Sequence, residues 1–233
     1  MSLEVREGEI LGIAGIDGNG QSELVEAITG MRPIQGGRVL VDGVDIRDKM
    51  PGEVRDLGLA HIPEDRMTTG LSVKSSVESN LLAGKQRTRD FAAGGVHLKR
   101  RTIRDYARQL FEKFDIRGAG VDTAAGSLSG GNMQKAVIAR EFSLGAKALI
   151  VSQPTRGVDI GAIEFIHKSI VDKRNAGCAV LLVSADLDEV FRLSDRIVTM
   201  YGGHVTGSFR AGEIDKAAIG YYMTGARDEE VGT

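Results

Sequence analysis

The sequence predicts an α/β fold with a mixed sheet and flanking helices, on three observations. Residues 9–15 form an apolar run that leads at once into a glycine-rich loop and then a helical pattern over 21–30. Two further apolar runs, 148–152 and 179–184, are continuous, which is typical of strands buried on both faces of a parallel sheet. Residues 160–177 have the apolar spacing of an amphipathic helix, so these three segments together predict a βαβ unit.

The overall composition narrows the class of protein. The chain has 233 residues, of which 42% are hydrophobic, and this is enough for one large domain or two small ones. Lys and Arg total 30 against 32 for Asp and Glu, so the net charge does not favour a nucleic-acid partner and none is expected. Cys178 is the single cysteine, which excludes an intrachain disulfide and suits a reducing compartment.

The apolar runs also bear on membrane association. No run reaches the roughly 18 apolar residues of a membrane span, and the first ten residues lack the apolar core of a signal peptide. Any membrane association is therefore expected to go through a protein partner. Because the first strand pattern begins so early, we expect the chain to be one domain of a longer protein.

The remaining segments predict the domain organisation. Residues 36–46 are typical of a β-hairpin that turns at Asp42-Gly43, and 57–63 of a strand. Helical patterns without a convincing strand follow, and the chain is expected to close with a hairpin around Gly202-Gly203. We therefore predict a first part of the α/β core over 1–72, a helical subdomain over 73–127, and the rest of the core over 128–233.

The stretch from Gly15 to Glu23 nearly matches a phosphate-binding loop. The motif for such a loop is G-x-x-x-x-G-K-[ST], and the chain has Gly15, Gly20 and Ser22 at the required spacing. Gln21 stands where the lysine belongs. From this stretch alone, a plain tight turn between strand and helix explains the glycines equally well.

Further motifs decide between these readings. The sequence LSGG occupies 128–131, an apolar strand ends at Ser152 and Gln153, and PTRGVD follows over 154–159. In this order they resemble the nucleotide-binding domain of an ABC transporter, with its signature motif, Walker B strand and D-loop. The phrases DGNGQSELVEAITG, IPEDR and QPTRGVDIGAIEFIHK are similar to the second nucleotide-binding half of bacterial importer ATPases for simple sugars and nucleosides. GNGQ with QPTRG favours the nucleoside branch.

The resemblance implies a P-loop NTPase fold of the ABC type, with a mixed sheet, a small β-hairpin region and an inserted helical subdomain. It also implies ATP and Mg²⁺ as cofactors, a second ABC nucleotide-binding domain and transmembrane permease subunits as partners, and a place at the cytoplasmic face of the membrane. The chain lacks the upstream segment in which the family carries an aromatic residue for adenine. The implied nucleotide-binding residues are Gly15, Asp17, Gly18, Asn19, Gly20, Gln21, Ser22, Glu23, Ser129, Gly130, Gly131 and Asp159, with the Ser22 hydroxyl on the metal.

Several positions depart from the family pattern. Gln21 replaces the lysine, and Ser152 and Gln153 replace the Walker B aspartate and the catalytic glutamate. Ala185 stands at the switch histidine and Glu64 at the Q-loop glutamine. Backbone N–H groups and the helix dipole can still bind phosphate, so we expect weakened nucleotide binding. Without a metal carboxylate or a general base, we do not expect efficient ATP turnover.

The intact signature gives the leading hypothesis. In this family two domains pair head to tail, and each signature loop caps the nucleotide of the other domain. We therefore expect this chain to complete a partner's ATP site while its own is impaired. One alternative is a slow ATPase that uses Glu64 or Asp65 as its base. Another is an ABC-type ATPase of DNA repair, which the short stretch between Ser22 and Leu128, without sustained heptads, disfavours.

Overall fold

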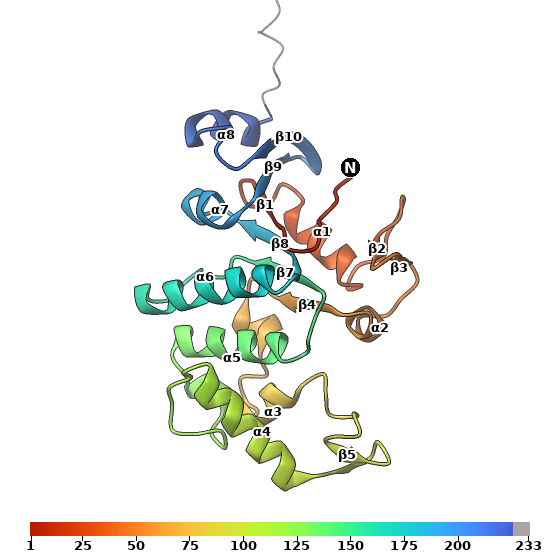
Figure 1. The fold of residues 1–233 in the computed structure, drawn as a ribbon, viewed down its shortest axis with the longest axis vertical. Helices are drawn as coiled ribbons and strands as arrows, with labels where there is room; N and C mark the ends of the chain where they lie inside the picture. The colour runs from red at the N-terminus through yellow and green to blue at the C-terminus, as the bar shows by residue number, and fades with distance from the viewer. Residues whose placement is uncertain (226–233) are drawn as a thin grey trace, which may run out of the picture. The chain divides into compact units, whose positions relative to one another are not determined.

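The structure, a computed structural model, describes residues 1–225. The chain of Figure 1 forms two compact units, which we call the sheet unit and the helical unit after their main secondary structure. The sheet unit comprises Met1–His61, Lys147–Gln153 and the described chain from Ile170 onward. The helical unit comprises Ile62–Ala146 and Pro154–Ser169. This division differs from the boundaries expected from sequence, because the helix that follows the signature belongs to the helical unit.

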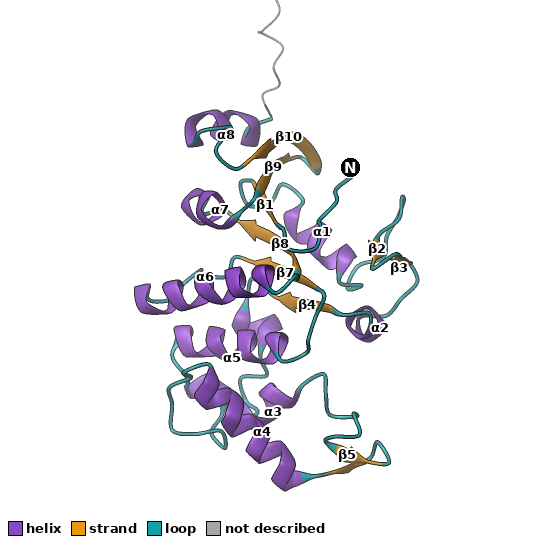
Figure 2. Ribbon diagram, in the orientation of Figure 1, coloured by secondary structure: helices purple, strands orange, loops and turns teal. Residues whose placement is uncertain are grey.

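A six-stranded sheet forms the centre of the sheet unit. Strands are coloured orange in Figure 2. The strand order of the sheet is β10-β9-β1-β8-β7-β4, and β1 pairs in parallel with both β8 and β9. β7 pairs in parallel with β8, whereas β10 returns antiparallel to β9 after the turn at Gly202-Gly203. The sheet is therefore mixed, as predicted. The strands are β1 (Ile10–Ala14), β4 (Leu59–Ile62), β7 (Ala148–Ser152), β8 (Ala179–Ser184), β9 (Arg196–Tyr201) and β10 (His204–Arg210).

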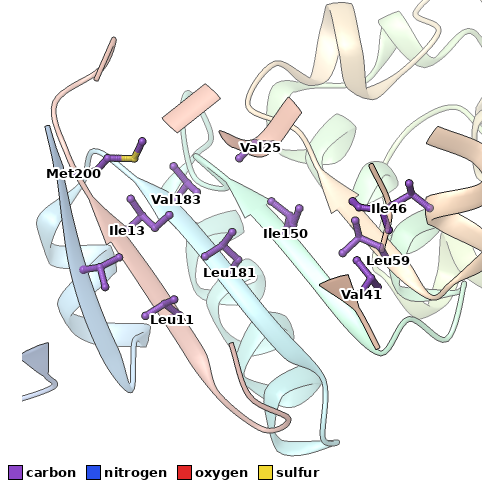
Figure 3. Close-up of a cluster of buried hydrophobic side chains, with 12 residues drawn as sticks. Leu11, Ile13, Val25, Val41, Ile46, Leu59, Ile150, Leu181, Val183 and Met200 are labelled. Carbon is purple, nitrogen blue, oxygen red and sulfur yellow. The ribbon is translucent and has the colours of Figure 1, made fainter. Parts of the chain in front are cut away.

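The side chains of β1 alternate between two apolar clusters. Leu11 and Ile13 belong to a cluster that also holds Val25 from α1 (Figure 3). Ala14 belongs to a second cluster with Val190 from α7 and Ile219 from α8. Since successive strand residues point to opposite faces, the central strand is buried by helices on both sides. The helices of this unit are α1 (Gln21–Ile28), α2 (Pro51–Asp56), α7 (Leu187–Leu193) and α8 (Lys216–Met223).

The predicted hairpin near residue 42 is present. β2 (Leu40–Val41) pairs antiparallel with β3 (Val44–Asp45). Asp42 and Gly43 both have positive φ, at 49° and 77°, which is the geometry of a type I′ turn. Lys147 donates to Asp42 Oδ2 and ties the turn to the residue before β7.

The helices of the helical unit differ in how much of their surface is buried. The long helix α5 has nearly every residue from Gly131 to Glu141 buried, whereas α4 is buried along one face by Ile103, Ala107 and Leu110. Helix α6 begins in this unit and its last residues lie in the sheet unit. The elements are a π-turn η1 (Arg66–Gly70), α3 (Val77–Leu82), α4 (Arg100–Lys113), a 3₁₀ turn η2 (Ala125–Ser127), α5 (Gly130–Phe142) and α6 (Ile160–Asn175).

One expectation for this region needs correction. The sequence predicted helices without a strand, but a short hairpin joins α3 to α4. β5 (Ala92–Ala93) pairs antiparallel with β6 (His97–Leu98), with Gly94 and Gly95 at positive φ between them. Each strand has only two residues, which is too short to produce an alternating pattern that sequence reading can detect.

Candidate functional site

The candidate phosphate loop joins β1 to α1 in the sheet unit. Gly18 and Gly20 have φ values of 87° and 99°, in the left-handed region that favours glycine. Gly20 is the N-cap of α1, and no side chain caps its first turn. The first N–H groups of α1 are thus left available, and the helix dipole favours an anion there. The Ser22 and Glu23 side chains are exposed beside them.

The Gln21 side chain folds back into this loop. It is only 8% exposed, and its Nε2 donates to the Ile16 carbonyl at 3.1 Å while its Oε1 accepts from the Asn19 N–H at 3.0 Å. A Cβ on Gly15 would overlap Nε2, so glycine is required beneath this side chain. One loop N–H is therefore already bonded to the chain's own amide instead of being free for a phosphate.

The loop is also fixed to the turn between β9 and β10. Asn19 Nδ2 donates to Ile16 O at 2.9 Å, and Asn19 Oδ1 accepts from the Gly202 N–H at 3.0 Å. The Gly203 N–H donates to Asn19 O at 2.8 Å. Asn19 was predicted as a loop residue, but its partners about 180 positions away in the chain could not be read from the local sequence.

Gln153, which the sequence predicts to stand at the catalytic-glutamate position, bonds through its side chain to both Asp17 and Ala185. Its Oε1 accepts from the Ala185 N–H at 3.1 Å, and its Nε2 donates to Asp17 Oδ1 at 3.4 Å. Its own N–H donates to Val183 O at 2.8 Å, and its φ is 45°. An amide can donate and accept at once, which a glutamate cannot do. The structure thus brings Asp17, Gln153 and Ala185 together.

The residues present fit the phosphates of ATP better than they fit Mg²⁺, the two cofactors that the resemblance implies. The glycine geometry and the uncapped helix fit the phosphates of a nucleotide. For Mg²⁺, the Walker B position holds Ser152, which is 5% exposed and whose Oγ has no hydrogen-bond partner. No group of three His, Cys, Asp or Glu side chains suited to a metal occurs among residues 1–225. The loop geometry fits phosphate, and the residue at the predicted Walker B position offers a hydroxyl and no carboxylate to a metal ion.

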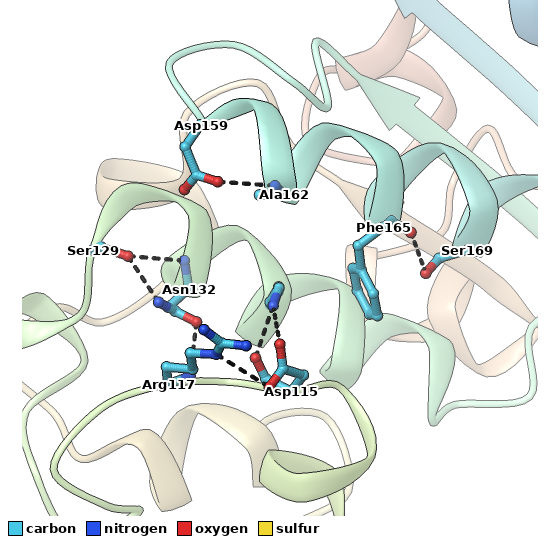
Figure 4. A network of polar contacts seen from close by, with 9 residues as sticks. Asp115, Arg117, Ser129, Asn132, Asp159, Ala162, Phe165 and Ser169 are labelled. Atoms are coloured by element: carbon cyan, nitrogen blue, oxygen red, sulfur yellow. Dashed lines mark hydrogen bonds and ion pairs between the residues drawn. The ribbon is translucent and has the colours of Figure 1, made fainter.

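The signature residues lie in the helical unit, at the start of α5. Ser129 is exposed and caps the helix, since its Oγ accepts from the Asn132 N–H at 3.4 Å and from Asn132 Nδ2 at 2.8 Å (Figure 4). Asn132 Oδ1 accepts from the Arg117 N–H at 2.7 Å. A Cβ on Gly131 would lie 2.7 Å from Asp159 Oδ2, so the signature packs closely on the segment before α6.

Three further acidic residues of the helical unit, Asp159, Glu64 and Asp65, each bond to groups of that unit. Asp159 Oδ1 accepts from the Ala162 N–H at 2.9 Å and so caps α6. Glu64, which the sequence predicts to stand at the Q-loop position, is ion-paired with Arg156. Asp65 accepts from the Thr68 hydroxyl and from the N–H groups of Met67 and Thr68, and these bonds lower the pKa of its carboxyl below the usual value. Both carboxylates are thus bound within their own unit.

The comparison with protein families gives the identity of the domain. The model described as ABC transporter matches residues 1–156. The chain belongs to the ABC transporter ATPase family. Binding of ATP with Mg²⁺ is a general property of this family.

Curated relatives agree over almost the whole chain. The nucleoside import ATP-binding protein NupA of Lactococcus lactis is 44% identical over 99% of this ABC domain and 45% of its own length. The guanosine import ATP-binding protein NupO of Bacillus subtilis is 42% identical over 100% of the domain and 45% of its own length. A glucose import ATP-binding protein of Haloferax volcanii is 44% identical over 98% and 42%. The chain spans about half the length of these relatives.

Solved structures share the fold. A nucleotide-free ATP-binding cassette from an ABC transporter superposes with a TM-score of 0.75 at 25% identity, covering 91% of this chain and 84% of the other. A dimeric cassette in a post-hydrolysis state with ADP and phosphate has a TM-score of 0.75 at 20% identity, covering 91% and 89%. The ABC-type α/β fold predicted from sequence is confirmed.

Proposed function

We propose that this domain is the impaired half of an ABC importer ATPase, and that its signature loop completes the ATP site of a second nucleotide-binding domain. The observation that carries the proposal is a contrast within one chain. Ser129, Gly130 and Gly131 match the family signature at the start of α5. In the chain's own loop, by contrast, the Gln21 side chain accepts from the Asn19 N–H, and Gln153 accepts from the Ala185 N–H.

In its own site, the residues from Gly15 to Glu23 would hold the phosphates of ATP through backbone N–H groups and the N-terminus of α1. Bound ATP supplies the phosphoryl group that the family transfers to water. Gln21 provides no positive charge, and Gln153 has no carboxylate to accept a proton from water. Ser22 would supply a hydroxyl to Mg²⁺, and Ser152 would add no carboxylate. Weak binding and little turnover follow from these residues.

In the partner's site, this domain would supply hydrogen-bond donors for phosphate but no general base. The N-terminus of α5 presents the N–H groups of the glycine pair, and the Ser129 hydroxyl is exposed beside them. Helix N-termini favour anions, so this surface suits the terminal phosphate of a nucleotide held by another domain. Asp159 lies directly against Gly131 and helps fix the shape of that surface.

The names of the relatives support an import role. Two of them are nucleoside or guanosine import proteins and one is a glucose import protein, so a nucleoside or simple sugar is the proposed class of solute. Their length leaves room for a second nucleotide-binding half in one polypeptide. No helix among residues 1–225 is long and apolar enough to cross a membrane. The proposed location is the cytoplasmic face of the membrane, held there by permease subunits.

The alternative of a slow ATPase with Glu64 or Asp65 as base is less well supported. Arg156 holds Glu64, and Asp65 is occupied by three donors from Met67 and Thr68. The pKa of Asp65 is lowered by these bonds, chiefly by that from the Thr68 hydroxyl, which makes its carboxylate a poorer proton acceptor at neutral pH.

The deciding experiment measures ATP hydrolysis by the complete protein in which this domain is paired with a lysine-bearing domain. Ser129→Arg fills the signature surface, Gln21→Ala empties the phosphate loop, and Ser208→Arg adds the same charge on the exposed strand β10 as a control. We expect Ser129→Arg to lower kcat by about a hundredfold or more, because transition-state contacts are lost. The other two variants should keep near-parental rates.

The opposite pattern would overturn the proposal. If Gln21→Ala is the damaging change and Ser129→Arg is tolerated, the domain's own loop carries the activity. Rapid Mg²⁺-dependent hydrolysis by the isolated chain that resists Ser129→Arg would have the same meaning.

A further inference from the structure

Arg66 lies on a π-turn that is fixed at both ends. Asp65 caps the turn by accepting from Met67 N at 2.7 Å and Thr68 N at 3.2 Å. At the other end, the Gly70 carbonyl accepts from Arg140 Nη1 at 2.7 Å, and Arg140 belongs to α5, which begins at the signature. The backbone that carries Arg66 is therefore anchored to the signature helix.

The Arg66 guanidinium donates hydrogen bonds to two consecutive backbone carbonyls of the D-loop. Nη1 donates to Arg156 O at 2.7 Å and Nη2 donates to Gly157 O at 2.8 Å. Glu64, two residues earlier, pairs with the Arg156 side chain, so the same loop holds Arg156 by both its carbonyl and its charge. A planar fork of donors is needed to reach two carbonyls at once, and a lysine ammonium can reach only one with comparable geometry.

The gripped segment lies directly beneath the signature glycines. A Cβ on Gly130 would come within 2.8 Å of Arg66 Nη2 and 3.1 Å of Gly157 O. A Cβ on Gly131 would lie 2.7 Å from Asp159 Oδ2 and 3.1 Å from the Ala162 Cβ. Gly130 therefore rests against the Arg66 guanidinium and the Gly157 carbonyl that it bonds, and Gly131 rests against Asp159 and Ala162 of the segment that follows.

We propose that Arg66 is a positioning residue for the nucleotide site of the partner domain, because it sets the D-loop in register with the signature loop. This inference rests on the proposed function, in which the signature caps the partner's nucleotide. Arg66 need not touch the nucleotide, since both of its Nη atoms are used on backbone carbonyls. Its effect is on the alignment of the donors at the start of α5.

The test uses the complete protein with both nucleotide-binding domains and four variants: Arg66→Gln, Arg66→Lys, Ser129→Arg, and Arg101→Gln as a matched control. Arg101 lies exposed on α4, and no hydrogen bond or ion pair of its side chain is seen within residues 1–225. Steady-state hydrolysis gives kcat and KM for ATP, and thermal melting of each variant monitors folding.

Misalignment of a group by about 1 Å costs up to a hundredfold in rate, so we expect Arg66→Gln to lower kcat by about tenfold or more. KM for ATP should change by less than about threefold, because the partner's own phosphate loop captures ATP. The kcat of Arg66→Lys should lie between those of the parent and Arg66→Gln, because lysine keeps the positive charge and can donate to one of the two carbonyls. Arg101→Gln should match the parent. A purely structural role would lower the melting temperature without this separation of kcat from KM.

Each outcome separates the two proposals. If Ser129→Arg abolishes turnover and both Arg66 variants keep the parental kcat, the positioning role is wrong and the proposed function stands. If Ser129→Arg has no effect either, the proposed function fails. Should Arg66→Gln fail to fold, Arg66→Lys decides: a parental kcat overturns the inference and an intermediate kcat supports it.

Discussion

Gln153 has a strained backbone conformation, and both the Oε1 and the Nε2 atoms of its side chain form hydrogen bonds. Its φ of 45° is in the left-handed region, which costs a residue with a Cβ about 1–3 kcal/mol and persists only when neighbouring bonds hold it. Here three bonds hold it, to Val183 O, Ala185 N and Asp17 Oδ1. These bonds therefore hold the Gln153 side-chain amide between Asp17 and Ala185.

We predict that Gln153→Ala frees the backbone N–H of Ala185. Its acceptor, Gln153 Oε1, is removed, so amide hydrogen exchange at Ala185 should become faster by about tenfold or more, the equivalent of roughly 1.4 kcal/mol of lost protection. Exchange followed by NMR or mass spectrometry measures this.

Gln86→Ala is the matched control, because Gln86 Oε1 accepts from the Gly84 N–H within the helical unit. It should speed exchange at Gly84 and leave Ala185 unchanged. Equal protection of Ala185 in the parent and in Gln153→Ala would show that the bridge does not hold this amide.

At the same scale, the assignment of substituted positions stays a prediction from the sequence, whereas the contacts of these side chains come from the structure. Gln21, Gln153 and Ala185 are visible in the motifs as departures. The bond of Gln21 to Asn19 is local and spans two positions. The bonds of Gln153 to Asp17 and Ala185 join segments 136 and 32 positions apart, which no local pattern encodes. Arg66 was visible only as the last letter of IPEDR, because its partners lie 90 and 91 positions away.

At the scale of elements, β1 shows why a glycine is needed in a central strand. Gly12 points to the side of α7, where an added Cβ would overlap Ser194 Oγ and lie 2.9 Å from Val190 Cγ1. Helix α7 can approach the strand closely only because no side chain stands between them. The phosphate loop begins three residues later, so this contact also sets where the loop starts.

We expect Gly12→Ala to destabilise the domain by about 1–3 kcal/mol, because the core must shift to accept one more carbon atom. Denaturant unfolding followed by circular dichroism measures the free energy of unfolding. Gly220→Ala, in α8 with nothing within 4 Å of the new Cβ, is the control and should be neutral or stabilising by up to about 1 kcal/mol. A fully stable Gly12→Ala domain would contradict the close packing of α7 on β1.

The elements themselves were largely predictable. The long apolar runs of β7 and β8, the spacing of α6 and the turn at Asp42-Gly43 each carry a strong local signal, and all were confirmed. The β5–β6 hairpin and the π-turn at Arg66 have two and five residues and depend on local bonds such as those of Asp65. Short elements of this kind leave no periodicity for sequence to reveal.

At the scale of the whole molecule, the proposed impairment can be tested by restoring the family residues. If the domain is impaired as proposed, a restored chain should pair with a second copy, and each copy should cap the nucleotide of the other with residues 128–131. We predict that the combined variant Gln21→Lys, Ser152→Asp, Gln153→Glu and Ala185→His gains Mg²⁺-dependent ATP hydrolysis, at least about a hundredfold above the parent chain, the usual contribution of a general base.

Activity per molecule should rise with protein concentration, since two copies are needed, and adding Ser129→Arg should abolish it. A repaired chain that melts like the parent yet hydrolyses no ATP would contradict the idea that these four positions account for the impairment.

The bond between Asn19 and the turn at Gly202-Gly203 also constrains the order of folding. The phosphate loop lies near the start of the chain, but its shape depends on a hairpin formed by almost the last described strands. Contacts so distant in sequence form late, because a large loop must close first. We therefore expect the nucleotide loop to take its final shape only after β9 and β10 have been synthesised. A nascent chain released before residue 203 should contain the loop sequence but lack its bonds to Gly202 and Gly203.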